Sequence, residues 1–202
     1  MGENCGRVAA IVLAAGQGSR FGGLKQIALL AGKPLLEYPL SALKQAGISE
    51  RVVVLGSGAR LVQDSICLHG ATIVECADWQ HGQSRSLASG VAAVSEADAT
   101  LVLLGDQPMI TPEAITRLVA SRKLGISALR ATYNGRLGHP VLLEAGLFSR
   151  CRSVEGDVGA RRMLRSEFVL PVACEDVACD LDVDSPEALG AVQRMMSARA
   201  RE

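Results

Sequence analysis

The sequence predicts an α/β fold in which a doubly wound, mostly parallel (Rossmann-like) sheet is covered by helices on both faces. Short apolar runs alternate with turns and amphipathic stretches, and this order is typical of buried parallel strands joined by crossover helices. The chain has 202 residues, 49% of them hydrophobic, which suits one domain with a large core. No linker rich in Ser, Gly or Pro divides it, so residues 1–202 are interpreted as a single domain.

The first half shows the alternation most clearly. Each apolar run has the length of a strand, and each is followed by a stretch long enough for a helix. Strands are expected at 8–13, 52–55, 71–74 and 100–104, and helices at 34–46, 59–68, 84–94 and 112–124. Pro39 lies inside the first of these helices, so that helix should either kink or begin later than residue 34.

The second half is less regular. Thr111-Pro112 and Ser185-Pro186 each place a hydroxyl side chain before a proline, a pattern that marks the start of a helix. Strands are expected at 126–131, 140–143 and 168–172, and helices at 159–165 and 186–200. A doubly wound sheet with additions in its C-terminal half accounts for this order most economically.

Composition excludes several classes of function. Lys plus Arg and Asp plus Glu both number 21, so no overall charge favours nucleic acid or an anionic membrane. Aromatic residues make up only 3%, too few for the stacking platforms of single-stranded nucleic-acid binders. Residues 1–7 lack the features of a signal peptide, and the apolar run 8–15 is too short to span a bilayer. Six scattered cysteines fit free thiols, so a cytoplasmic protein is expected, with neither nucleic acid nor membrane as partner.

A glycine-rich loop with two cations follows the first strand. Residues 13–26 read L-A-A-G-Q-G-S-R-F-G-G-L-K-Q. Glycines let backbone N–H groups approach an anion, and Arg20 and Lys25 can neutralise phosphate charge. Neither a dinucleotide fingerprint nor a P-loop fits, because Phe21 takes the third glycine position and Gln26 follows the lysine. The alternative interpretation is a tight connection with two solvated cations.

This loop is similar to the signature of the nucleotidyltransferases that include sugar-phosphate and molybdenum cofactor enzymes. Further segments match in order: G-D-Q-P at 105–108, G-H-P at 138–140, G-D-V-G-A-R at 156–161 and D-V-D-S-P-E at 182–187. Together they resemble the molybdenum cofactor cytidylyltransferases, whose family also includes the guanylyltransferases. The resemblance implies a fold of the nucleotide-diphospho-sugar transferase type, and transfer of CMP from CTP to the terminal phosphate of molybdopterin with release of pyrophosphate.

The resemblance also implies the nucleotide site, with Arg20, Lys25 and Asp106 as catalytic residues. Lys25 would stabilise charge at the α-phosphate or on the departing pyrophosphate. The segment 81–87 resembles a G-M-S-x-S-L loop, from which Gln83 and Arg85 depart. The nucleotide-binding residues expected are Leu13, Ala14, Ala15, Gly16, Gly18, Arg20, Lys25, Gly82, Ser84, Ser86 and Asp106. For the two serines, capping of a helix N-terminus is the alternative.

A metal site is expected at the G-D-Q-P turn. Mg²⁺ prefers oxygen ligands and keeps several waters, so one or two carboxylates and the substrate phosphates suffice, with Mn²⁺ as the alternative ion. Asp106 is the first candidate ligand, and Asp184 or the less favoured Asp182 is the second. The competing roles are a turn-capping aspartate for Asp106 and a helix cap for Asp184.

The acceptor side is assigned by resemblance. Residues expected to bind the molybdopterin-type substrate are Gln107, Pro108, His139, Asp157 and Arg161. His139 could equally be a hydrogen-bonded residue at a strand start, and Asp157 and Arg161, four apart, could form a helix-surface pair. The implied partners are CTP, the acceptor and a molybdoenzyme or its chaperone.

Two different functions stay open. The chain could join a nucleotide to another phosphorylated small molecule, or it could be a non-catalytic nucleotide-binding chaperone for a cofactor. Ala14-Ala15 favours the cytidylyl branch over the guanylyl branch, whose loop usually reads L-A-G-G. Retention of Arg20, Lys25, Asp106 and Asp184 argues against a non-catalytic version, since these residue types suit turnover more than simple binding.

Overall fold

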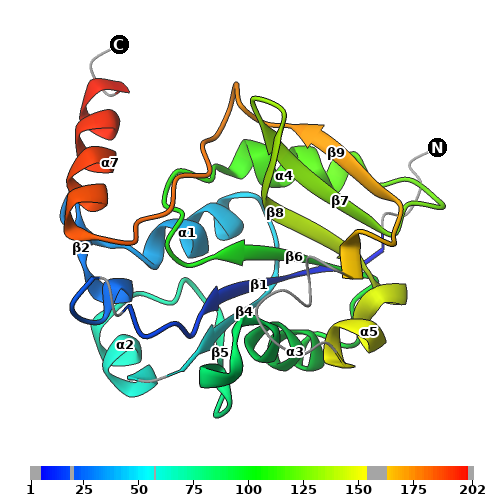
Figure 1. Ribbon diagram of the computed structural model, residues 1–202, viewed down its shortest axis with the longest axis horizontal. Coiled ribbons are helices and arrows are strands. Elements are labelled where there is room, and N and C mark those ends of the chain that lie inside the picture. The colour runs from blue at the N-terminus through cyan, green and yellow to red at the C-terminus, as the bar shows by residue number, and fades with distance from the viewer. Residues whose placement is uncertain (1–5, 19–20, 57, 154–162, 200–202) are drawn as a thin grey trace.

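A seven-stranded sheet runs through the middle of the molecule with strand order β5-β4-β1-β6-β8-β7-β9 (Figure 1). The computed structural model describes residues 6–18, 21–56, 58–153 and 163–199. The strands of the sheet are β1 (Val8–Ala14), β4 (Glu50–Leu55), β5 (Thr72–Glu75), β6 (Ala99–Leu104), β7 (Ala128–Tyr133), β8 (Arg136–Glu144) and β9 (Val169–Ala173). A separate two-stranded ribbon is formed by β2 (Leu29–Leu30) and β3 (Lys33–Pro34).

The sheet is mostly parallel, as the sequence predicted. β1 pairs in parallel with β4 and β6, and β7 pairs in parallel with β9. β8 is the exception and runs antiparallel to both of its neighbours. The reason is local: Asn134 and Gly135 join β7 to β8 with positive φ angles of 51° and 76°, the backbone of a tight hairpin.

Helices cover both faces of the sheet because its strands are apolar on both sides. Ala10 and Val12 of β1 face α1 (Glu37–Gln45), α2 (Ala59–Ser65) and α4 (Pro112–Ala120), whereas Ile11 faces α3 (Gln83–Ala93) and α5 (Phe148–Ser153). Short 3-10 helices lie at Lys25–Ile27, Trp79–His81 and Ala145–Leu147. No helix in the described ranges combines the length and apolar character needed to cross a membrane.

Several element boundaries differ from those expected. α1 begins at Glu37, so the helix starts later than residue 34. Pro39 falls in its first turn, where its missing N–H costs no helical hydrogen bond. α2 and α4 end earlier than predicted, at residues 65 and 120. β8 begins at Arg136, four residues earlier than predicted, because its first residues pair through the hairpin rather than through an apolar run. Most of the helix expected at 159–165 lies outside the described residues.

After β9 the chain returns across the molecule to α7 (Pro186–Arg199), which stands beside the β2–β3 ribbon (Figure 1). Val183 and Val192 pack there against Leu30 and Leu35. α7 begins at Pro186 as predicted, and Ser185 Oγ accepts a hydrogen bond from Ala188 N at 3.2 Å. The return segment therefore passes the carboxyl end of β6, where Val183 N donates to Asp106 O at 2.9 Å.

Candidate active site

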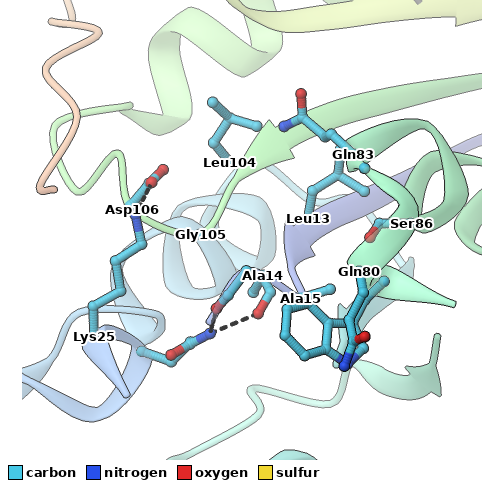
Figure 2. Close-up of a pocket in the computed structure, with 14 residues that line it drawn as sticks. Leu13, Ala14, Ala15, Lys25, Gln80, Gln83, Ser86, Leu104, Gly105 and Asp106 are labelled. Carbon is cyan, nitrogen blue, oxygen red and sulfur yellow. Dashed lines mark hydrogen bonds and ion pairs between the residues drawn. The ribbon is translucent and has the colours of Figure 1, made fainter. Parts of the chain in front are cut away.

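A cavity of about 350 Å³, the first cavity, opens at the carboxyl ends of β1 and β6 (Figure 2). Open α/β sheets bind their ligands at this edge. The residues that line it are Leu13, Ala14, Ala15, Gly16, Lys25, Gln26, Trp79, Gln80, Gly82, Gln83, Ser86, Leu104, Gly105 and Asp106. The loop after β1, the turn after β6 and the start of α3 thus converge on one space.

Gln26 holds the glycine-rich loop in shape. Its Nε2 donates to Ala14 O at 2.7 Å and to Gly16 O at 3.0 Å, and the residue is only 4% exposed. Further along, Gly18 adopts a φ of +64°, and its carbonyl accepts a hydrogen bond from Phe21 N at 2.8 Å. A left-handed backbone favours glycine at this position. These hydrogen bonds fix three carbonyls of the loop, at residues 14, 16 and 18.

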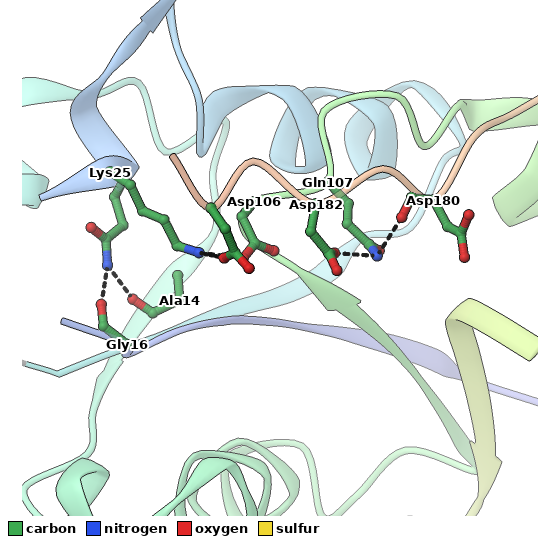
Figure 3. A network of polar contacts seen from close by, with 9 residues as sticks. Ala14, Gly16, Lys25, Asp106, Gln107, Asp180 and Asp182 are labelled. Atoms are coloured by element: carbon green, nitrogen blue, oxygen red, sulfur yellow. Dashed lines mark hydrogen bonds and ion pairs between the residues drawn. The ribbon is translucent and has the colours of Figure 1, made fainter. Parts of the chain in front are cut away.

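Lys25 lies between two carboxylates. Its Nζ is 2.5 Å from Asp106 Oδ2 and 2.9 Å from Asp184 Oδ1, and Figure 3 shows Lys25 pointing at Asp106. The Lys25 and Asp106 side chains are 15% and 18% exposed. Burial by itself lowers the pKa of Lys25, but the two aspartates outweigh it and the pKa is raised overall. Lys25 is consequently a fixed positive charge at neutral pH.

Gln107 ties the C-terminal return segment to the turn after β6. Its Nε2 donates to Asp182 Oδ1 at 2.8 Å and to Asp180 O at 3.2 Å (Figure 3). Partial desolvation raises the pKa of Asp182, the Gln107 hydrogen bond opposes this, and the charge of Asp106 adds to it. Gln107 and Pro108, expected to contact substrate, are buried and do not line the first cavity. Gln107 instead positions the segment that carries Asp184.

Asp106 has an oxygen that suits a metal ion. Its Oδ1 is buried and has no hydrogen-bond partner among the described residues, whereas Oδ2 contacts Lys25. The described residues contain no group of three or more His, Cys, Asp or Glu arranged to hold a metal. Two carboxylates with substrate phosphates and water are a sufficient set for Mg²⁺, however, and Asp106 and Asp184 both reach the same lysine.

A smaller second cavity, of about 100 Å³, adjoins the first on the face covered by α3 and α5. Both cavities are lined by Leu13, Gln83 and Leu104. The other residues of the second cavity are Ser84, Leu87, Val102, Arg130, His139, Val141, Leu143, Met163 and Leu164. Ser84, expected in the nucleotide site, thus lies in the second cavity, while Ser86 lies in the first.

The N-capping interpretation of these serines is wrong. Gly82 is the N-cap of α3, and no side chain caps that helix. Ser84 is 2% exposed, and its Oγ has no hydrogen-bond partner in the part of the chain that the structure describes. A buried hydroxyl without a partner is uncommon, and this one is available to hydrogen-bond a ligand in the second cavity.

Most of the residues expected to bind nucleotide line the first cavity. Of the residues expected to bind nucleotide, those that line it are Leu13, Ala14, Ala15, Gly16, Lys25, Gly82, Ser86 and Asp106. Gly18 does not line it, and Arg20, Asp157 and Arg161 lie outside the described residues. Sequence reasoning missed the roles of Gln26, Trp79, Gln80 and Gly105. Three of these carried a visible signal: Trp79 is the one tryptophan of the chain, Gln26 stands next to the loop lysine, and Gly105 opens the G-D-Q-P motif.

Known proteins resemble this chain over nearly its whole length. The family model described as "MobA-like NTP transferase domain" matches residues 10–172. A protein of Paenarthrobacter nicotinovorans named nicotine blue oxidoreductase is 34% identical over 192 residues, which cover 90% of this chain and 94% of the relative.

Solved structures also resemble this chain over most of its length. The homolog of Mycobacterium tuberculosis Rv0371c from Mycobacterium sp. strain JC1 superposes with a TM-score of 0.83 and 28% identity, over 95% of this chain and 98% of that one. Rv0371c of M. tuberculosis H37Rv in complex with manganese gives a TM-score of 0.78 and 25% identity, covering 93% and 98%. Nucleotidyltransferases with 14 to 21% identity superpose with TM-scores of 0.75 to 0.80, and their likeness establishes that the fold is of the nucleotide-diphospho-sugar transferase type.

Proposed function

Because the chain belongs to the family of MobA-like NTP transferase domains, we propose that it transfers CMP from CTP to the terminal phosphate of a molybdopterin-type acceptor and releases pyrophosphate. The observation that carries this proposal is Lys25 held between Asp106 and Asp184 at the mouth of the glycine-rich loop. A protonated lysine beside two potential metal ligands is suited to the charge that develops in phosphoryl transfer. The product would pass to a molybdoenzyme or its chaperone in the cytoplasm.

The reaction needs alignment more than acid–base chemistry. An oxygen of the acceptor phosphate attacks the α-phosphorus of CTP, a new P–O bond forms, and the bond to the β-phosphate oxygen breaks, so that pyrophosphate leaves with its electron pair. The nucleophile is already an anion, so no general base is required. Lys25 supplies a positive charge at the α-phosphate or the leaving group, and Arg20 is proposed as a second cation on the triphosphate.

The proposed metal is Mg²⁺, with Mn²⁺ as the alternative ion. Asp106 and Asp184 are the proposed ligands, with Asp182 as the less favoured choice in place of Asp184. The orphaned Oδ1 of Asp106 supports this assignment, as does the manganese complex of the mycobacterial relative. When bound, the ion would orient the triphosphate and withdraw charge from it.

CTP is the proposed donor because the loop reads L-A-A-G, as expected for the cytidylyl branch, and because the backbone of that loop lines the first cavity. A Cβ on Gly105 would come within 2.8 Å of Ala14 Cβ, and one on Gly56 would come within 2.5 Å of Ala15 O. The Ala14-Ala15 backbone is therefore closely packed and held in place, which suits recognition of a base edge by main-chain groups. Ser86, at 4% exposure, offers a nearby hydroxyl.

The name of the Paenarthrobacter relative suggests a second candidate, a redox enzyme on the same fold. The loop argues against a dinucleotide cofactor in this chain, because Phe21 stands where the fingerprint needs its third glycine. Two further candidates are transfer to a different phosphorylated small molecule and simple nucleotide binding by a cofactor chaperone. Experiment can separate all of these activities, because each leaves a different product or none.

The test is to incubate the purified chain with Mg²⁺, molybdopterin and each of CTP, GTP, ATP and UTP in turn, and to measure pyrophosphate. Release with CTP and molybdopterin together, lost with EDTA, is the expected result. Equal release with GTP would overturn the base assignment and leave the reaction class standing. Binding of CTP without release of pyrophosphate would favour the chaperone. A separate incubation with NADH or NADPH and an electron-accepting dye tests the redox enzyme, which would oxidise the nicotinamide and reduce the dye.

A further inference from the structure

We propose that the second cavity holds the ring of the acceptor, a planar heteroaromatic ring of the pterin class, and that the Ser84 hydroxyl binds the polar edge of that ring. This inference rests on the proposed function and makes it more specific. It also moves Ser84 from the nucleotide side, where the sequence placed it, to the acceptor side.

The second cavity lies next to the first, where an acceptor would have to bind. It shares Leu13, Gln83 and Leu104 with the first cavity, and Figure 2 shows these three residues close together on one side of that cavity. Leu104 ends β6 and leads through Gly105 to Asp106. A ring in the second cavity could therefore extend its phosphate past Leu104 toward Lys25 and the α-phosphate.

The lining of the second cavity indicates the class of ligand. Its walls are mostly aliphatic, and their members are Leu13, Leu87, Val102, Leu104, Val141, Leu143, Met163 and Leu164. Apolar walls with a few placed polar groups bind flat rings, whose faces are apolar and whose edges carry donors and acceptors. A sugar, which carries hydroxyl groups around its whole ring, would leave most of them without partners against such walls.

The polar residues of the second cavity include Arg130, His139 and Ser84, and hydrogen bonds hold the first two in place. Arg130 is held across the β7–β8 hairpin, where its Nε donates to Gly138 O at 3.0 Å. The backbone at His139 is fixed by Tyr133, whose hydroxyl donates to His139 O at 2.7 Å. Ser84 lies opposite them on α3, and its buried Oγ lacks a partner among the described residues. One hydroxyl can both donate and accept, which matches the alternating N–H and C=O groups along a pterin edge.

The proposal predicts a particular pattern of losses. Pterin-6-carboxylate is fluorescent, so its binding to the full chain can be followed by quenching, in parallel with calorimetric binding of CTP and Mg²⁺. Ser84→Ala should weaken pterin binding by about tenfold and leave CTP binding unchanged, because a site that loses a hydrogen bond to its ligand loses affinity on that scale. Ser86→Ala is the matched control, two residues away on α3, and should weaken CTP binding without affecting the pterin.

A structural role for Ser84 would produce a different result. Its hydroxyl makes no hydrogen bond in the described part of the protein, so Ser84→Ala should melt at the same temperature as the unmodified chain or higher, whereas loss of a structural hydrogen bond would lower the melting temperature. Ser84→Gly, which keeps the cavity open, is the second variant and should match Ser84→Ala in pterin binding.

Three outcomes would overturn the inference: no saturable binding of pterin-6-carboxylate to the unmodified chain, equal loss in the Ser84 and Ser86 variants, or a Ser84 variant that loses CTP instead. The failure of the proposed function is distinguishable from these. A chain that binds the pterin through Ser84 but releases no pyrophosphate keeps the second cavity and loses the transferase activity. A chain that releases pyrophosphate without Ser84-dependent pterin binding keeps the transferase activity, and the assignment of the second cavity is then wrong.

Discussion

The two halves of the sheet build their cavities from different parts of the chain. At the parallel half, the first cavity is lined by residues at the carboxyl ends of β1 and β6 and in the loops that follow them, such as Ala14, Gly16 and Gly105, together with the start of α3. The second cavity extends from there toward the mixed half, where strand side chains such as Arg130 and His139 face residues of α3. Phosphates are the same in every nucleotide and can be bound by a backbone of fixed shape, whereas acceptors differ and need side chains that can differ with them.

The C-terminal return segment connects the two halves. It leaves the mixed half after β9 and delivers Asp184 to Lys25 at the parallel half, held on the way by Gln107. The charged groups proposed for catalysis therefore lie together on the parallel side, and predictions that separate the proposed catalysis from acceptor recognition test this division.

The largest effect is expected for Lys25→Ala. Removing this cation should lower kcat by about 10²–10³-fold with a smaller effect on ground-state CTP binding, because a fixed charge is most valuable where charge develops. Single-turnover rates and CTP affinity measured side by side would check this. Lys33→Ala is the control, since Lys33 lies over the Tyr38 ring, 4.8 Å from its centroid, and does not line the first cavity. An unchanged single-turnover rate for Lys25→Ala would remove this residue from the chemistry.

An intermediate effect is expected for the carboxylates. Asp106→Asn and Asp184→Asn should each reduce pyrophosphate release by at least about tenfold and raise the Mg²⁺ concentration required, since a bound metal contributes several kcal/mol to such transition states. Asp182→Asn should be milder, because Asp182 is bonded to Gln107 rather than to Lys25.

Titration of release against Mg²⁺ for the three variants decides the assignment. Thermal melts in parallel would identify any variant that has simply lost its fold. If Asp184→Asn behaves like the unmodified chain while Asp182→Asn fails, the second ligand is Asp182. If Asp182→Asn and Asp184→Asn both show the Mg²⁺ requirement of the unmodified chain, the return segment supplies no metal ligand. Its role in connecting the two halves is then structural only.

The smallest effect is expected on the free energy of unfolding. It compares Gly105, which is closely packed beside the first cavity, with Gly146, which has open space around it in the mixed half. A Cβ on Gly105 would lie 2.8 Å from Ala14 Cβ and 2.9 Å from Leu36 Cδ1, whereas one on Gly146 would meet nothing within 4 Å. Gly105→Ala should therefore lower the free energy of unfolding by about 1–3 kcal/mol, while Gly146→Ala should not destabilise to this degree. Denaturant unfolding of both variants measures the difference, and equal stabilities would mean that Ala14 and Leu36 can shift at little cost in free energy.

The sequence by itself determined the features that depend on neighbouring residues. The strands of the parallel half, the glycine-rich loop with Lys25 and the turn with Asp106 were all predicted, because apolar periodicity and short motifs are written in contiguous stretches of the chain. The resemblance added the second aspartate, but the sequence could not choose between Asp182 and Asp184, since both can lie on one face of an extended segment.

Only the tertiary structure decided which distant residues meet and which face each side chain takes. Lys25 and Asp184 are 159 positions apart, and their contact depends on the return segment that Gln107 and the packing of α7 hold in place. Ser84 and Ser86 look equivalent in the sequence, yet two residues on an α-helix point about 200° apart. The packing of α3 on the sheet therefore sends Ser86 into the first cavity and Ser84 into the second, and no local pattern fixes that rotation.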